Sequence, residues 1–225
     1  MSATGNHRPA NQSCQVDDID WEMLWAPYDA DTYALVLREI RPADVVIDIG
    51  AGDFRLVTQM AGIAHTVYGV EIHSGLMPPA HQTPANVVAI NADARQWPFP
   101  DDITTAVLLM RHCSHFSTYY QKLKTTGCKK LITNARWRMG VEVIDLRQPA
   151  IEYRHCPMGW YACQCGQVGF KPGPVELYSW ADDQHTYEVA NCPNCMKTKK
   201  ANQHYEIVKE DRRSELSTMK QWVNQ

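Results

Sequence analysis

Two cysteine pairs are the most complete set of candidate metal ligands in this sequence. One residue separates Cys163 from Cys165, and two residues separate Cys192 from Cys195. Two thiolates held across a tight turn can bind a tetrahedral zinc ion, and a second pair completes its four ligands. Gly166 follows the shorter pair, where such a turn needs a permissive backbone. We therefore expect Cys163, Cys165, Cys192 and Cys195 to bind one zinc ion.

A site closed by four protein ligands is structural, because zinc catalysis requires an open coordination position. His155 and Cys156 are the substitutes if one of the upstream cysteines is not a ligand. Strands are expected at 175–180 and 186–190, and the segment resembles a zinc ribbon. Its metal would stabilise a fold too small to form its own core.

A glycine-rich turn and two acidic residues form a second constellation. The turn Asp48-Ile49-Gly50-Ala51-Gly52 follows a buried strand and precedes a helix. Glycines there let the backbone approach a ligand closely. Glu71 ends the next strand, where a carboxylate can accept both hydroxyls of a ribose. Asp93 follows the third strand, where a carboxylate can accept the exocyclic amine of adenine.

The same layout might hold a dinucleotide, but that fingerprint requires a third glycine where Arg55 stands. Asp48 also lies just before the turn, where its carboxylate could pair with the ammonium group of a methionine, which favours S-adenosylmethionine over a dinucleotide. The constellation resembles the class I S-adenosylmethionine-dependent methyltransferases over about residues 28–146. The resemblance implies that Asp48 and the glycines contact the methionine half of the cofactor, Glu71 the ribose and Asp93 the adenine. The cofactor-binding residues that it implies are Asp48, Gly50, Ala51, Gly52, Glu71, Ile72, Asp93, Ala94 and Met110.

In that family the loop after the fourth strand carries the substrate chemistry. Here it contains His112, Cys113 and His115, which are the catalytic candidates. Either histidine could act as a general base near neutral pH. Cys113 lacks the preceding proline of covalent cytosine-C5 enzymes, and a bare cysteine after a strand is more often a small buried hydrophobic residue than a nucleophile. The loop also lacks Asn-Pro-Pro-Tyr or Asp-Pro-Pro-Tyr, which disfavours methylation of adenine N6 or cytosine N4.

A second loop, after the fifth strand, contains Arg136, Trp137 and Arg138. Two arginines flanking a tryptophan could stack on a base or bind a phosphate. The alternative is a solvated turn with Trp137 packed inward.

The elements that must position these residues follow from the hydrophobic pattern. Apolar runs alternate with short helices, which predicts an α/β, Rossmann-like doubly wound sheet. Residues 134–140 are too few for a crossover helix, so the sixth strand must run antiparallel to the fifth. Asp29 or Asp31 caps a helix that ends near Ile40. Strands are predicted at 45–49, 66–70, 86–90, 105–110, 130–133 and 141–146, and helices at 54–61 and 115–125.

The chain has 225 residues, 44% of them hydrophobic, and a net charge of −3. These values are typical of a globular protein and disfavour a strongly cationic nucleic-acid binder. No apolar run is long enough to span a membrane and no signal peptide is evident, so we expect a cytoplasmic protein. The expected organisation is a disordered N-terminus (1–18), a cofactor-binding domain (19–150), a zinc-ribbon-like module (151–200) and a C-terminal helix (201–225).

These features predict a methyltransferase that uses S-adenosylmethionine and acts on a macromolecular acceptor, RNA or protein. The zinc ribbon would help to fix or recognise that acceptor. The alternative is a non-catalytic adaptor with a methyltransferase fold in a larger assembly. A nicotinamide-dependent oxidoreductase is a third possibility, which Arg55 disfavours.

Overall fold

The computed structural model describes residues 26–111, 113–137, 140–176 and 185–197. The predicted disordered segment 1–18 and the predicted C-terminal helix 201–225 lie outside these residues, as do His112, Arg138 and most of the strand predicted at 175–180. No helix within the described ranges is long and apolar enough to cross a membrane.

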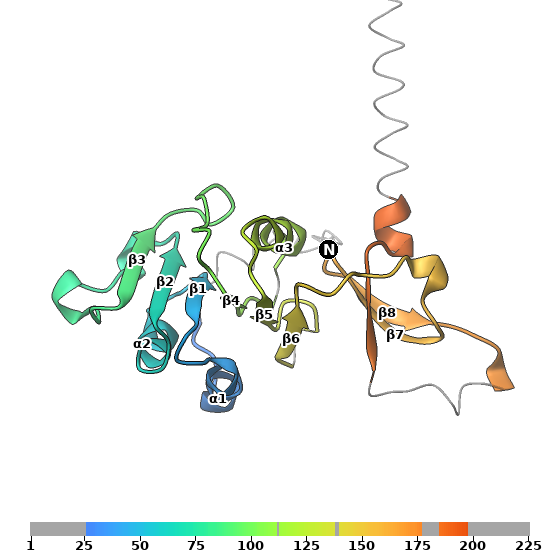
Figure 1. The fold of residues 1–225 in the computed structure, drawn as a ribbon, viewed down its shortest axis with the longest axis horizontal. Coiled ribbons are helices and arrows are strands. Elements are labelled where there is room, and N and C mark those ends of the chain that lie inside the picture. Colours follow the sequence, from blue (N-terminus) through green and yellow to red (C-terminus); the bar gives the residue numbers. More distant parts are fainter. Residues whose placement is uncertain (1–25, 112, 138–139, 177–184, 198–225) are drawn as a thin grey trace, which may run out of the picture.

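The main sheet has six strands in the order β3-β2-β1-β4-β5-β6 (Figure 1). The first five strands in this order run parallel, and β6 pairs antiparallel with β5, as the short connection predicts. The strands are β1 (Val45–Ile49), β2 (Thr66–Glu71), β3 (Val87–Asn91), β4 (Thr105–Leu108), β5 (Lys130–Thr133) and β6 (Glu142–Asp145). The predicted α/β fold is confirmed, although β4 ends two residues earlier than expected.

Helices cover both faces of this sheet (Figure 1). Helices α1 (Ala30–Glu39) and α2 (Arg55–Ala61) lie on one face, and α3 (Phe116–Thr125) lies on the other. The alternation of β1 explains this, since Val46 packs in the α1/α2 core and Ile47 and Ile49 in the α3 core. Asp29 caps α1 by accepting the Thr32 N–H at 2.7 Å, which confirms one of the two predicted caps.

No helix joins β3 to β4 in the described chain. The short 3-10 helices η2 (Ser74–Leu76) and η3 (Ala80–Gln82) precede β3, and an irregular loop follows it. Lys122 of α3 holds this loop by donating to the carbonyl oxygens of Ala94 (2.6 Å), Arg95 (3.2 Å) and Trp97 (2.6 Å). One part-buried ammonium therefore satisfies three carbonyl groups that no helix satisfies.

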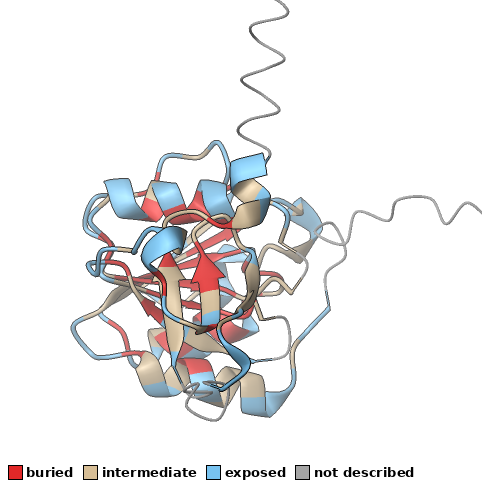
Figure 2. Ribbon diagram, turned by 90° about the vertical axis from the view of Figure 1, so that its right-hand side faces the viewer, coloured by how far each residue is buried: buried red, intermediate tan, exposed pale blue. Residues whose placement is uncertain are grey.

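A second sheet lies beyond the β6 edge and has the order β8-β7-β9 (Figure 1). Its strands are β7 (Gly159–Cys163), β8 (Val168–Lys171) and β9 (Thr186–Val189), and the 3-10 helix η4 (Tyr153–His155) precedes them. Figure 2 views the molecule from this side and shows buried segments within strands, among more exposed helices and loops.

Arg136 connects the two sheets. Its side chain is 0% exposed, and Nη2 lies 2.6 Å from both Glu142 Oε2 of β6 and Glu188 Oε1 of β9. Arg136 therefore neither faces solvent nor can bind a phosphate, so both predictions for this arginine are wrong. The reason is that two carboxylates from distant segments converge on it.

Candidate functional site

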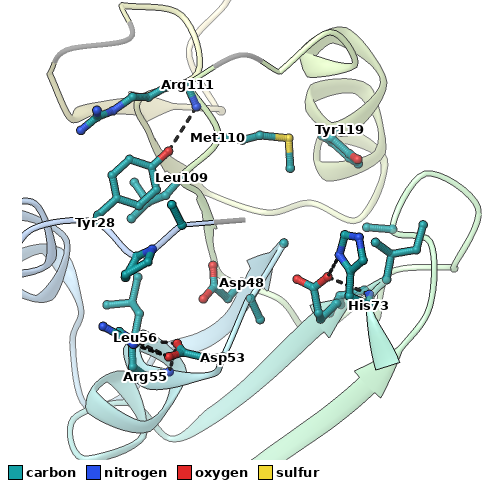
Figure 3. Close-up of a pocket in the computed structure, with 18 of the residues that line it drawn as sticks. Tyr28, Asp48, Asp53, Arg55, Leu56, His73, Leu109, Met110, Arg111 and Tyr119 are labelled. Carbon is teal, nitrogen blue, oxygen red and sulfur yellow. Dashed lines mark hydrogen bonds and ion pairs between the residues drawn. The ribbon is translucent and has the colours of Figure 1, made fainter. Parts of the chain in front are cut away.

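A cavity of about 800 Å³ opens at the carboxyl ends of β1, β2, β3 and β4 (Figure 3). Its volume is within the ~300–1,000 Å³ typical of small-molecule sites. Every predicted cofactor residue except Gly52 lines it: Asp48, Gly50, Ala51, Glu71, Ile72, Asp93, Ala94 and Met110. The topology thus brings together residues that the sequence placed at separate strand ends.

The turn after β1 adopts the left-handed backbone conformation that favours glycine. Gly50 and Gly52 have φ values of +76° and +57°. The N–H groups of Gly50 and Ala51 donate to Val70 O at 2.9 and 3.0 Å, which ties the turn to β2. A Cβ at Gly50 would lie 3.1 Å from the end of Met110. The turn therefore keeps the cavity floor free of side chains.

Glu71 is buried and held in place by three protein donors. Its Oε2 accepts the Gly52 N–H at 2.8 Å, and its Oε1 accepts the His73 N–H at 2.8 Å and lies 2.9 Å from His73 Nδ1. A carboxylate offers about four acceptor positions. To accept two ribose hydroxyls, Glu71 must therefore lose one of these donors, and the part-exposed His73 ring is the one free to turn away.

Asp48 is 3% exposed and lines the same cavity (Figure 3). Burial, and secondarily the charge of Glu71, raise the pKa of Asp48 to about 7. A cation bound in the cavity would stabilise the ionised carboxylate, so Asp48 suits the ammonium of an amino acid.

Asp93 and the catalytic candidate His115 are connected through Arg95. The Arg95 guanidinium hydrogen-bonds Asp93 at 2.9–3.1 Å and lowers the pKa of that carboxyl. Arg95 Nη1 also donates to His115 Nε2 at 3.0 Å. His115 does not line the cofactor cavity, and Cys113 lines a neighbouring one. Their catalytic roles, with that of His112, stay predictions.

Two residues that line the cavity, Tyr28 and Arg111, carried no sequence signal. Tyr28 precedes α1, and its hydroxyl accepts the Arg111 N–H at 3.2 Å, while the Arg111 guanidinium lies 4.8 Å from the Tyr28 ring centre (Figure 3). Tyr28 N–H in turn donates to Tyr33 Oη at 3.0 Å. This wall depends on segments far apart in sequence, and no motif spacing reports it.

The four predicted cysteines form one cluster. Their sulfur atoms all lie within 4.8 Å of one another, with Cys163 and Cys195 at 3.9 Å and Cys165 and Cys192 at 3.7 Å. Four sulfurs at ~2.3 Å from a tetrahedral zinc ion are about 3.8 Å apart. A disulfide needs about 2.05 Å. The cluster therefore fits a metal and not two disulfides.

The turns around the cluster support the same interpretation. Cys192 N–H points at Cys195 Sγ (3.1 Å), and Gly166, with φ +94°, closes the turn after Cys165. The substitute ligands His155 and Cys156 are outside the cluster. Cys156 is buried beside it, with its thiol donating to Pro157 O at 3.4 Å.

Comparison with protein families places the cofactor cavity in a known type of domain. Residues 47–126 match the family model described as a methyltransferase domain. The chain contains a methyltransferase domain. The matched segment of this domain includes the glycine turn, Glu71, Asp93 and the loop after β4.

Solved structures resemble part of the chain. Precorrin 8W decarboxylase from Methanobacterium thermoautotrophicum is 21% identical, with a TM-score of 0.42, 48% of this chain covered and 63% of that chain. The 23S rRNA methyltransferase ErmE is 20% identical, with a TM-score of 0.42, and the match covers 47% of this chain and 46% of ErmE. Trm5b from Pyrococcus abyssi is 16% identical, with a TM-score of 0.41, and the match covers 49% of this chain and 34% of Trm5b. The chain thus spans less than two thirds of each, and no curated protein matches it.

Proposed function

We propose that the protein is an S-adenosylmethionine-dependent methyltransferase that acts on a macromolecular acceptor. The observation that carries the proposal is that Asp48, Gly50, Glu71 and Asp93 all line one cavity. These residues lie in the segment that matches a methyltransferase domain. In this proposal Asp48 receives the methionine ammonium, Glu71 the ribose and Asp93 the adenine amine.

S-adenosylmethionine supplies a methyl group on a sulfonium: the carbon–sulfur bond breaks toward sulfur as the acceptor atom bonds to carbon, and the acceptor then loses any proton that it carried. The protein's part is to orient the two reactants, which contributes much of the rate when the acceptor is already nucleophilic. The fixed Glu71 carboxylate and the glycine turn supply this orientation on the cofactor side.

We further propose that the cysteine cluster holds a structural zinc ion, since its sulfur spacing fits a tetrahedral site. The zinc would hold the end of β7 and the turn after it to the segment that follows β9, within the small module. The resulting module would then form part of the acceptor site, for RNA or for a protein.

Isothermal titration of the zinc-loaded protein with S-adenosylmethionine tests the proposal. We expect one site per chain, loss of binding in Asp48→Ala and unchanged binding in Asp145→Asn. Asp145 is the last residue of β6, and its carboxylate pairs with the exposed Arg147. Absence of binding by the folded wild-type protein would overturn the proposal.

A non-catalytic adaptor is the second candidate. It is favoured by the position of His115, which is bonded to Arg95 and outside the cofactor cavity. Binding of S-adenosylmethionine without methylation of RNA, DNA or protein in a cell extract would support this candidate.

A further inference from the structure

A second cavity, of about 620 Å³, lies where the methyltransferase domain meets the small sheet. Its walls come from the loop after β4 (Arg111, Cys113), the segment after β5 (Trp137) and the turn after β7 (Cys165, Gly166). Arg111 lines both this junction cavity and the cofactor cavity. A ligand in the junction cavity would therefore be next to a bound cofactor.

Arg111, at the boundary of the two cavities, carries an unused hydrogen-bond donor. Its Nε is buried and has no hydrogen-bond partner. A buried donor without a partner costs ~1–3 kcal/mol, so an oxygen or nitrogen acceptor from a ligand is favoured here. The nearby Arg136 cannot supply this contact to a ligand, because Glu142 and Glu188 occupy its guanidinium.

These charges also disfavour a cationic acceptor such as a lysine or arginine side chain. The guanidinium of Arg111 would repel it. The two carboxylates at the junction, Glu142 and Glu188, are already paired with Arg136. A neutral, planar group with acceptor atoms on its edge fits better.

Aromatic rings continue from the cavity over the small sheet. Trp137 lines the cavity, and its ring centre is 5.9 Å from that of Trp160, which is 5.4 Å from that of Phe170. Trp160 and Phe170 are a cross-strand pair of β7 and β8, and Trp160 is 37% exposed. These rings meet edge to face, at 72° and 80°, so they do not form one stack. The face of an aromatic ring can stack on a base of a single strand, at ~1–3 kcal/mol per base.

We infer that the junction cavity binds a base of single-stranded RNA as the methyl acceptor, with Trp137 stacking on it and Arg111 hydrogen-bonding its edge. This inference rests on the proposed methyltransferase function. Because one arginine and aromatic rings form the site, affinity for RNA should depend weakly on salt, unlike that of a protein contacting many phosphates.

Fluorescence anisotropy with a labelled single-stranded RNA of about 12 nucleotides tests the inference on the full zinc-loaded chain. Trp137→Ala should weaken binding by about fivefold or more, which corresponds to the loss of one stacked base, and Trp137→Phe should restore most of it. Arg111→Gln should also weaken binding. Arg147→Gln is the matched control and should bind normally, because Arg147 is an exposed arginine just after β6 that does not line the junction cavity.

Zinc content, measured on the same samples, shows whether each variant is folded, and S-adenosylmethionine affinity does so for the Trp137 variants, since Trp137 does not line the cofactor cavity. Wild-type protein that binds S-adenosylmethionine but not RNA, or that binds RNA equally well after Trp137→Ala, would overturn this inference and leave the proposed function intact. Loss of S-adenosylmethionine binding in the wild type would instead overturn the proposed function. Trp137-dependent methylation of a protein, without RNA binding, would assign the cavity to a peptide and overturn the RNA assignment.

Discussion

The buried Arg136 and the part-exposed Glu188 form an ion pair that joins the main sheet to the small sheet. Nη2 of Arg136 lies 2.6 Å from Oε1 and Nη1 lies 2.8 Å from Oε2, so the contact is bidentate. Burial opposes the charge of Arg136, but the hydrogen bonds to Glu188 and Glu142 outweigh it and raise the pKa of the guanidinium. Glu188 lies on β9 and pairs with Ala162 of β7 in the small sheet. The ion pair with Arg136 therefore fixes the small sheet at a defined position.

Replacing Glu188 with glutamine should loosen this junction. Glu188 is 29% exposed and Arg136 keeps Glu142, so we expect a loss of ~1–3 kcal/mol of stability rather than the ~3–5 kcal/mol of a fully buried pair. Denaturant unfolding measures the loss, and hydrogen exchange should show faster exchange in β9. Asp145→Asn, which breaks an exposed pair, should change stability by less than about 1 kcal/mol. Equal effects of the two variants would contradict this account.

The junction also shows what the sequence could not predict. Strands, the glycine turn and the cysteine pairs follow from local patterns, and the structure bears them out. Arg136 contacts a residue 52 positions away, and Arg111 contacts Tyr28 across 83 positions. Such contacts depend on how sheets pack, so the pattern around Arg136 predicted neither its burial nor its partners.

Replacing Asp48 with asparagine should separate stability from cofactor binding. The folded pKa of Asp48, about 7, lies above its ordinary value of 3.8. Ionising this group therefore costs stability as pH rises from about 4 to about 7, and the cost persists above that range. Asp48→Asn removes this cost, so it should stabilise the cofactor-free protein by up to a few kcal/mol relative to wild type at about pH 8, and much less at about pH 4.

Denaturant unfolding at the two pH values measures this effect, and titration with S-adenosylmethionine should show weaker binding by the same variant. Asp145→Asn is the control. A stability difference that does not change with pH would show that the Asp48 carboxyl is not the titrating group.

Removing one cluster cysteine should unfold the small sheet selectively. Cys195→Ser should reduce zinc from one ion per chain toward none, because three thiolates leave the tetrahedral site incomplete. Hydrogen exchange should then rise in β7 and β9 and stay low in β1 and β4. Cys156→Ala is the control, since Cys156 lies outside the cluster, and it should keep its zinc. Loss of zinc from Cys156→Ala would instead identify Cys156 as a ligand.

A methyl group at Gly69 of β2 should disturb the glycine turn after β1, because it would displace the ring of Phe54, which follows that turn. A Cβ there would lie 2.5 Å from Phe54 Cε1, and Phe54 has a φ of +64° just before α2. Gly69→Ala must displace this ring, so we expect a loss of ~1–3 kcal/mol in stability and weaker S-adenosylmethionine binding. Gly75→Ala, where the added methyl meets nothing within 4 Å, should leave both unchanged. Normal binding and stability in Gly69→Ala would show that the ring moves without cost.

Lys122 should control the adenine side of the site without touching the cofactor. Its ammonium holds the carbonyl groups of Ala94, Arg95 and Trp97, directly after Asp93. Lys122→Met keeps the apolar stem and removes these bonds, so we expect about tenfold weaker S-adenosylmethionine binding, equivalent to ~1.4 kcal/mol. Adenosine alone should lose affinity by the same factor, because only the adenine loop is released. The exposed Lys129→Met is the control. If adenosine affinity is unchanged while S-adenosylmethionine affinity falls, the lysine acts elsewhere in the cavity.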